Sequence, residues 1–307
     1  MSAKRPIIID TDPGIDDAVA LGIALFAREL DVKLITTVSG NVGIEHVTNN
    51  ALKLLTFWTL STPVAKGAAR PLLREVRDAS EVHGVTGMEG YEFPEPNRGN
   101  LLNITAVQAM YQTLKESEEK ITIVAIGPLT NVALLLREYP EIKGKIAEIV
   151  LMGGALGRGN FGVLSEFNIA VDPEAAKIVF ESGLAIAMTP LDVGLKALVY
   201  PQDSEEIKQM NQTGDMMYSL FRKYRGGSFN TGLKMYDSCA IAYLLKPEMF
   251  TVQNVFVAVE TKGEYTSGAT VIDLKASLGK AANCKVCVDI DEELFKAWFL
   301  AALKRCH

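Results

Sequence analysis

Histidine and cysteine are scarce in this sequence of 307 residues, which contains three histidines and four cysteines. Four cysteines are too few for the disulfide framework of a secreted protein, so they favour a reducing compartment. No apolar run approaches the about 20 residues that a membrane span requires, and no signal-peptide pattern follows the opening residues MSAKRP. We therefore expect a cytoplasmic protein with no membrane partner.

Positive charge is also in short supply. Lys and Arg number 31 against 37 Asp and Glu, which gives a formal net charge of −6. A protein that binds nucleic acid needs a concentrated Lys/Arg surface to neutralise phosphates. The sequence therefore predicts that nucleic acid is not a partner.

Short β-branched segments alternate with longer helical patterns along the chain, as in a mostly parallel sheet covered by helices on both faces. We expect strands at residues 6–10, 32–40, 62–67, 121–127, 148–154, 184–190, 256–260 and 284–290. We expect helices at residues 43–58, 128–139, 172–182, 201–210, 214–225, 237–246 and 292–304. Because no linker interrupts this pattern, we predict one α/β domain over residues 1–307, with a doubly wound, mixed but mostly parallel sheet.

Four carboxylates surround a Pro-Gly turn in the segment IIIDTDPGIDDA, residues 7–18: Asp10, Asp12, Asp16 and Asp17. The first two end a predicted strand, and the other two open the following helix. Carboxylates in a first helical turn gain about 0.3 to 1 kcal/mol from the helix dipole, which accounts for two of the four without any function. The whole set in so tight a turn is costly to ionise, and a hard divalent cation would relieve that cost.

Polar residues follow other predicted strands as well. The segment SEFNIAVDPEAA, residues 165–176, comes after a glycine-rich stretch, so we expect Asn160, Glu166 and Asn168 on a long polar loop before a helix that begins near Pro173. Such a loop is suited to bind sugar hydroxyls. The structural alternative is that these residues form turns or cap helices, and for Asp172 we accept that alternative. Because the carboxyl ends of parallel strands bind ligands in open α/β sheets, these side chains and the opening aspartates are expected at one edge.

Three further motifs have competing interpretations. GRGNFG, residues 157–162, has the spacing of a dinucleotide-binding loop, but ten loop-like residues follow before any helical pattern, so we expect no such cofactor. Asp237 opens an apolar helix, where it is either an N-cap or a third metal ligand. The pair Cys284 and Cys287 looks like part of a strand without a second ligand pair, and we interpret both as ordinary buried cysteines.

Histidine offers little for nucleophilic catalysis. His46 falls inside a predicted helix and His307 is the last residue, so only His83, in the glycine-rich loop VHGVTGMEGY, is well placed for chemistry. Ser-His-Asp and Cys-His catalysis are thus poorly supported, and carboxylate-plus-metal chemistry is favoured.

Several motifs together resemble the inosine-uridine-preferring nucleoside hydrolase family from end to end: DTDPGIDDA, IGPLTNVALLL, IVLMGGALGRGN with SEFNIAVDPEAA, and YDSCAIAYLL. The stretch FVAVETKGEYTSGATVIDL, followed by LGKAANCKV, is most similar to the broad-specificity branch that accepts purine and pyrimidine ribonucleosides. The resemblance implies hydrolysis of the N-glycosidic bond to ribose and free base, for nucleoside salvage. It also implies a tightly bound Ca²⁺ and a homo-oligomer, either a dimer or a tetramer.

The resemblance further implies residue roles. The calcium ligands would be Asp12, Asp17, the main-chain carbonyl of Ile126, and Asp237. Asp12 would also be the general base that activates a calcium-bound water. The ribose hydroxyls would be bound by Asp16, Asn41, Asn160, Glu166, Asn168 and Asp237. An anionic pocket of this kind stabilises the positive charge that develops in an oxocarbenium-like transition state.

One position departs from the family pattern. Family members commonly have a histidine before the late metal-binding aspartate, where it protonates or contacts the leaving base, and here the residue is Tyr236. A phenol has an ordinary pKa near ~10 against ~6.5 for imidazole, so it exchanges a proton less readily at neutral pH. Three alternatives follow. The leaving group is assisted by His83, Tyr224 or Arg225, or Tyr236 itself is the acid, or the preferred bases leave with little assistance. Tyr236 as a mere pocket wall is the structural alternative.

Two other functions fit parts of the pattern. A non-catalytic nucleoside or ribose sensor could use the same scaffold, although the retained Asp12 and ribose-binding positions count against it. An aspartate-nucleophile phosphohydrolase also begins with an apolar strand ending in Asp-x-Asp, but it needs Thr or Val soon after the second Asp. Here Pro13 and Gly14 follow instead.

Overall fold

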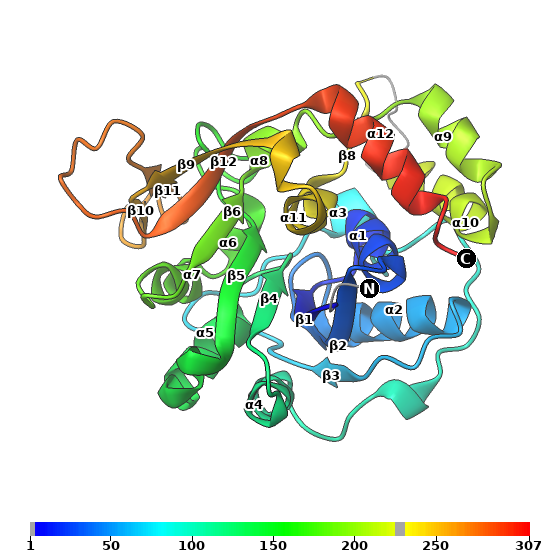
Figure 1. Cartoon of the computed structure of the whole chain (residues 1–307), viewed down its shortest axis with the longest axis horizontal. Helices are drawn as coiled ribbons and strands as arrows, with labels where there is room; N and C mark the ends of the chain where they lie inside the picture. Colours follow the sequence, from blue (N-terminus) through cyan, green and yellow to red (C-terminus); the bar gives the residue numbers. More distant parts are fainter. Residues whose placement is uncertain (1–3, 225–230) are drawn as a thin grey trace.

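The computed structural model describes residues 4–224 and 231–307, and an eight-stranded sheet forms its centre (Figure 1). The strand order is β3-β2-β1-β4-β5-β6-β12-β9. The bounds are β1 (Arg5–Thr11), β2 (Leu30–Thr37), β3 (Val64–Lys66), β4 (Ile121–Ala125), β5 (Ile146–Met152), β6 (Ile186–Thr189), β9 (Phe250–Val255) and β12 (Cys284–Ile290). Neighbouring strands are parallel except β12 and β9, which pair antiparallel. The predicted mixed, mostly parallel sheet is therefore confirmed.

Helices cover both faces of this sheet (Figure 1). One apolar core lies between the sheet and α1 (Ile15–Phe26), α2 (Ile44–Phe57), α10 (Gln212–Phe221), α11 (Tyr236–Leu245) and α12 (Glu292–Leu303). The other lies beneath α4 (Ala106–Glu116), α5 (Thr130–Glu138) and α7 (Pro173–Phe180). Side chains alternate along β1, so Ile7 and Ile9 enter the first core and Ile8 the second. This double burial explains the unbroken apolar run before the aspartates.

The remaining elements are short. They are α3 (Ser80–His83), α6 (Phe167–Val171), α8 (Leu191–Gly194), α9 (Pro201–Lys208), and the 3₁₀ turns at Arg98–Asn100, Pro140–Lys145 and Pro247–Met249. Two small antiparallel pairs join β7 (Leu198–Val199) to β8 (Leu233–Lys234) and β10 (Val257–Val259) to β11 (Thr270–Ile272). No helix within the described parts of the chain is both long and apolar enough to cross a membrane.

Element boundaries differ from expectation where the site begins. The strands expected at 32–40 and 121–127 end at Thr37 and Ala125, so the residues that follow form loops at the carboxyl edge. The edge strand β9 was not predicted, because four of its residues are exposed in a row and show no alternation. The helix expected to reach residue 225 ends at Phe221.

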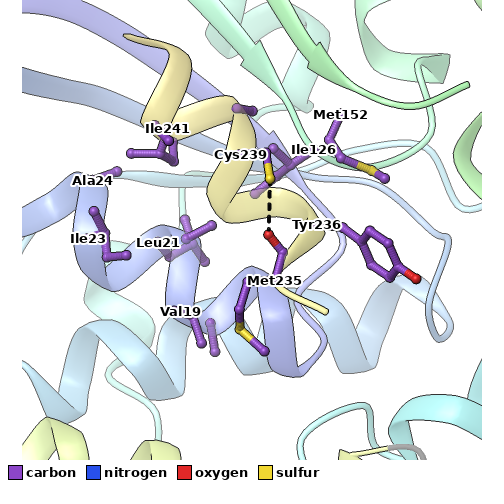
Figure 2. Packing of buried hydrophobic residues seen from close by; sticks show 14 of the residues in the cluster. Val19, Leu21, Ile23, Ala24, Ile126, Met152, Met235, Tyr236, Cys239 and Ile241 are labelled. Atoms are coloured by element: carbon purple, nitrogen blue, oxygen red, sulfur yellow. Dashed lines mark hydrogen bonds between the residues drawn. The ribbon is translucent and has the colours of Figure 1, made fainter. Parts of the chain in front are cut away.

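Helices α1 and α11 pack together on one face of the sheet (Figure 2). Leu21 of α1 lies next to the helix that carries Cys239 and Ile241, and all three side chains belong to the same apolar core. Almost every residue of α11 is buried, as expected of a helix that is apolar all round. Both helices begin at the carboxyl edge of the sheet, so this packing brings their acidic first turns side by side.

Candidate active site

A cavity of about 250 Å³ lies at the carboxyl edge of the sheet. The predicted site residues that line it are Asp16, Asn41, His83, Ile126, Asn160, Glu166, Asn168, Tyr236 and Asp237. Asp12 and Asp17 do not line the cavity, and both are buried. The structure thus brings together segments that are widely separated in the sequence, as the parallel topology predicts.

Three aspartates form a compact cluster at this cavity. Asp16, Asp17 and Asp237 each offer an oxygen, and these oxygens all lie within 4.8 Å of one another. Burial raises the pKa of Asp17, and burial together with repulsion from Asp16 and Asp17 raises the pKa of Asp237 well above its ordinary value. The cluster therefore contains Asp16, expected at the ribose, whereas Asp12 of the expected metal set lies outside it.

Asp17 is fixed by the turn that precedes α1. The Thr11 hydroxyl donates to its Oδ1 at 2.6 Å, and the Gly14 backbone N–H donates to its Oδ2 at 3.0 Å. The Asn41 side-chain amide donates to the same Oδ2 at 2.9 Å. These three bonds hold the carboxylate in one orientation and tie the loop after β2 to the start of α1.

Asp12 has one fixed oxygen and one unpartnered oxygen. The Asn41 backbone N–H donates to Oδ2 at 2.7 Å, whereas the buried Oδ1 has no hydrogen-bond partner among the described residues. A Cβ atom on Gly127 would lie 2.5 Å from this Oδ1, so the loop after β4 needs glycine there. Burial, and next the charge of Asp17, raise the pKa of Asp12 well above its ordinary value.

The donor set suits a hard cation. Carboxylate oxygens are the ligands that Ca²⁺ and Mg²⁺ prefer, and a buried, unpartnered oxygen beside three mutually repelling carboxylates is costly without a positive charge. The aspartate cluster can therefore hold a metal ion. The Ile126 carbonyl, also expected as a ligand, accepts a hydrogen bond of 3.1 Å from the Asn168 side chain.

Asn168 lies in a short helix and Glu166 caps it, so the prediction that both lie on a long polar loop was wrong, whereas the helix predicted to begin near Pro173 is confirmed as α7. Helix α6 begins at Phe167, and Glu166 is its N-cap, accepting from the N–H groups of Asn168 and Ile169. The Gly154 N–H donates to the same carboxylate at 2.9 Å. Burial raises the pKa of Glu166 to about 7, against the lowering effect of these bonds.

Asn160 lies at the rim of the cavity. Its side chain is exposed, and its Oδ1 accepts a hydrogen bond of 2.9 Å from the Phe167 N–H. The expectation of ten loop-like residues after Gly162 was also wrong, because α6 begins sooner. The glycine-rich motif still does not open a helix directly, as a dinucleotide-binding loop must.

His83 is the last residue of the short helix α3 rather than part of a loop. It is buried, and its Nδ1 accepts a hydrogen bond of 3.2 Å from the Ile15 N–H. Nδ1 also lies 4.0 Å from Asp16 Oδ1, and the His83 ring centroid lies 5.3 Å from that of Tyr224. The ring therefore stands between the start of α1 and the cavity.

Tyr236 is the first residue of α11, and its ring is buried. A Cβ atom on Gly194 would lie within van der Waals overlap of this ring, so α8 makes room for it through glycine. Arg225, the other residue considered for the leaving group, lies outside the described residues. Asp237 is not an N-cap, because the N-cap of α11 is Met235 and Asp237 lies inside the first turn.

The structural interpretations of three other residues are confirmed. Asp172 caps α7 by accepting a hydrogen bond of 3.1 Å from the Ala175 N–H. Cys284 and Cys287 are buried thiols of β12 that enter opposite cores. Among the described residues, the only group of metal-capable side chains is the aspartate cluster.

The apolar side of the cavity was not predicted from the sequence. Phe161 and Phe167 line it as an edge-to-face pair with ring centroids 5.6 Å apart, and Met152 and Val82 also line it. The two phenylalanines could have been found from their place inside polar motifs, because a half-buried aromatic ring among polar residues suits stacking on a ligand.

Comparisons with known proteins agree with this geometry. Residues 7–297 match the family model described as inosine-uridine preferring nucleoside hydrolase. The chain is 54% identical over 298 residues to the non-specific ribonucleoside hydrolase RihC of Salmonella enteritidis PT4 and of Salmonella typhi, covering 97% of each protein. Among solved structures, a purine-preferring ribonucleoside hydrolase from Gardnerella vaginalis superposes with a TM-score of 0.90 at 29% identity, covering 98% of both chains. The plant nucleoside hydrolase PpNRh1 superposes with a TM-score of 0.91 at 30% identity, covering 98% of this chain and 99% of that one.

Proposed function

Since the chain belongs to the inosine-uridine preferring nucleoside hydrolase family, we propose that it hydrolyses the N-glycosidic bond of purine and pyrimidine ribonucleosides to ribose and free base. The observation that carries this proposal is the cavity in which a carboxylate cluster meets polar residues suited to ribose. The relatives named non-specific ribonucleoside hydrolase support a substrate range that covers both base classes.

We infer that the metal ion is Ca²⁺, held by Asp12, Asp17, the Ile126 carbonyl and Asp237, with Asp16 beside it. The all-oxygen donor set and its buried negative charge support this choice. A bound ion of this kind lowers the pKa of water and orients the sugar.

Asp12 is proposed as the general base. Its Oδ2 is held by the Asn41 N–H, so its unpartnered Oδ1 has a fixed position from which to accept a proton. A base held in this way loses little entropy at the moment of reaction. Asp12 then receives the proton of the attacking water as the new bond to the sugar forms.

Asp16, Asn41, Asn160, Glu166, Asn168 and Asp237 are proposed to bind the ribose. Carboxylates accept hydrogen bonds from sugar hydroxyls, and the amides can donate as well as accept. The same carboxylates stabilise the positive charge that develops on the ribosyl group as the base departs. Because that charge is absent from the bound substrate, this contribution lowers the barrier rather than the Michaelis constant.

His83 is proposed to assist the leaving base. It lines the cavity, and its Nδ1 is occupied as an acceptor, so the ring carries its proton on Nε2. Tyr236 lines the same cavity and can donate a hydrogen bond to the base from its hydroxyl group. We assign this assistance to His83 as a hydrogen bond donated from Nε2 to the leaving base, because a ring whose Nδ1 accepts the Ile15 N–H is neutral and keeps its Nε2 proton. The base departs with the electrons of the broken bond and takes its proton from water.

We further propose that residues 1–307 form one domain and that the enzyme acts in nucleoside salvage in the cytoplasm as a homodimer or homotetramer. The completion of the sheet by the late strands β9 and β12 supports one domain, and four buried free cysteines suit a reducing compartment. Light scattering of the purified protein measures the assembly directly.

A nucleoside panel tests the proposed activity. The purified protein is incubated with inosine, adenosine, uridine and cytidine, and reducing sugar is measured with and without prior chelation of metal. The expected result is ribose release from both base classes that is lost on chelation. Binding of nucleosides without ribose release would instead indicate a sensor, and phosphate release from phospho-sugars would indicate a phosphohydrolase.

A further inference from the structure

The hairpin of β10 and β11 lies outside the central sheet and supplies none of the proposed site residues. Figure 1 places it at one end of the molecule near α7, against which β10 packs. Yet this hairpin contacts the two chain segments that hold Glu166. These are residues 153–155, after β5, and residues 165–171, which include Glu166 and α6.

The first contact is a reciprocal pair of hydrogen bonds. The Thr270 hydroxyl donates to the Ala155 carbonyl at 2.8 Å and accepts from the Ala155 N–H at 3.0 Å. Ala155 follows Gly154, whose own N–H donates to Glu166 Oε2. Gly154 has a φ of +74°, and a Cβ atom there would lie 2.7 Å from Thr270 Cγ2. Thr270 therefore packs directly on the residue that orients Glu166.

The second contact lies on the other side of Glu166. The Ser165 hydroxyl donates to the Ser267 carbonyl at 2.8 Å. Gly268, with a φ of +87°, lies so close to α6 that a Cβ atom would be 2.8 Å from Ala170 Cα. The hairpin thus touches the chain both before and after Glu166.

The Glu166 carboxylate depends on both segments at once. It accepts one N–H from Gly154 and two from α6, those of Asn168 and Ile169. Its orientation is therefore set by how the two segments lie relative to each other. Contacts from one hairpin to both segments fix that relation.

We propose that Thr270 is a positioning residue for Glu166, and that the β10–β11 hairpin clamps the ribose-binding side of the cavity from outside the sheet. This inference rests on the proposed function, because Glu166 is taken to bind ribose. The clamp acts on the sugar side of the site and leaves the aspartate cluster unchanged.

The test compares three variants. Thr270→Val removes the hydroxyl at nearly constant shape, and Thr270→Ser keeps the hydroxyl. Thr251→Val makes the same change at an exposed threonine of β9 and serves as the matched control. We expect Thr270→Val to lower kcat/KM for inosine and uridine about tenfold, less than the about hundredfold loss that a 1 Å misplacement near the chemistry can cause. Thr270→Ser and Thr251→Val should stay near wild type, with calcium affinity unchanged throughout.

A double-mutant cycle shows whether the effect runs through Glu166. In a Glu166→Gln background, Thr270→Val should have little further effect on kcat/KM, because the group that it positions has already lost its charge. An equal loss in both backgrounds would overturn the proposal, as would a Thr270→Ser variant as poor as Thr270→Val. If Thr270→Val does not fold, Ser165→Ala removes the other hydrogen bond to the hairpin and takes its place in the cycle. Failure of the proposed function is distinguishable, since the wild type would then release no ribose.

Discussion

The Nδ1 atom of His83 accepts a hydrogen bond from the backbone N–H of Ile15, the first residue of α1. Gly14 makes this approach possible, because a Cβ atom there would lie 2.5 Å from Nδ1. The same helix start carries Asp16 and Asp17. One turn of the chain therefore orients the proposed hydrogen-bond donor to the leaving base, one proposed metal ligand, Asp17, and the neighbouring Asp16.

Replacing His83 tests the leaving-group assignment. His83→Ala should lower kcat for inosine by about 10²-fold, the usual loss when a donor to developing negative charge is removed. His46→Ala, which removes an exposed histidine of α2, should leave kcat unchanged. Ribose release from inosine and uridine measures both variants, and an undiminished rate in His83→Ala would transfer the role to another group.

Tyr236 is expected to affect the preference between purine and pyrimidine nucleosides. Tyr236→Phe removes only the hydroxyl, and the ring keeps its place beside Gly194. We expect a changed ratio of kcat/KM between inosine and uridine, with the melting temperature and calcium content kept. If the rates on inosine, uridine and cytidine all stay the same, the hydroxyl has no part at the leaving group and the ring is a wall of the pocket.

Asp12 is the residue whose loss should be most severe for turnover. Asp12→Asn keeps the size of the side chain and removes the proton acceptor, so kcat should fall by about 10³-fold or more. Asp215→Asn, at an exposed position of α10, is the matched control and should leave kcat unchanged. Single-turnover ribose release provides the measurement, and substantial activity in Asp12→Asn would assign the base elsewhere.

Calcium should stabilise the fold as well as support turnover. An ion that binds only the folded chain raises the melting temperature, so chelation should lower it and calcium should restore it. Because burial raises the pKa of Asp17 and Asp237, protons compete with the ion, and calcium affinity should fall as the pH falls. Calorimetric titrations at several pH values test this, and an affinity that rises on acidification would contradict it. Asp17→Asn should weaken binding at every pH.

Asp10 should make stability depend on pH. Burial raises its pKa to about 7, against about 3.9 in an unfolded chain. Between these values the folded chain binds more protons, so the free energy of unfolding should fall as the pH rises from about 4 to about 7 and then level off.

Asp10→Asn keeps an oxygen for Thr36 and Asn131 and cannot ionise. At pH 8, with calcium saturating, we expect it to be more stable than wild type by about 1 kcal/mol or more. Urea unfolding measures this, and an unchanged pH slope in Asp10→Asn would contradict it.

The sheet was predictable because its strands are buried on both faces. Ile7, Ile8 and Ile9 enter two different cores, so they form an unbroken apolar run that indicates a central parallel strand. The edge strand β9 gives no such signal, since its exposed residues need no pattern. The five-residue helix α6 is too short for periodicity to reveal, and its N-cap is Glu166 instead of the usual Ser, Thr, Asp or Asn.

The segments that contribute to the candidate site were predictable, because polar residues at the carboxyl ends of parallel strands lie at the same edge of the sheet. Their relative placement was not. Asp16 joins Asp17 and Asp237 in the closest cluster while Asp12 lies just outside, which depends on how α1 turns after Gly14. The contact of Thr270 with Ala155 joins distant parts of the chain through side-chain hydrogen bonds, for which the sequence carries no pattern.

The packing of α1 against α11 also determines when, during synthesis of the chain, the carboxylate site can form. The opening aspartates leave the ribosome early, whereas Asp237 and the helix that carries it are synthesised late. The proposed metal site is complete only once α11 packs on α1, so metal binding by the full site would follow translation of most of the chain. A truncated product that ends before α11 would lack Asp237, and tight calcium binding would then distinguish finished molecules from fragments.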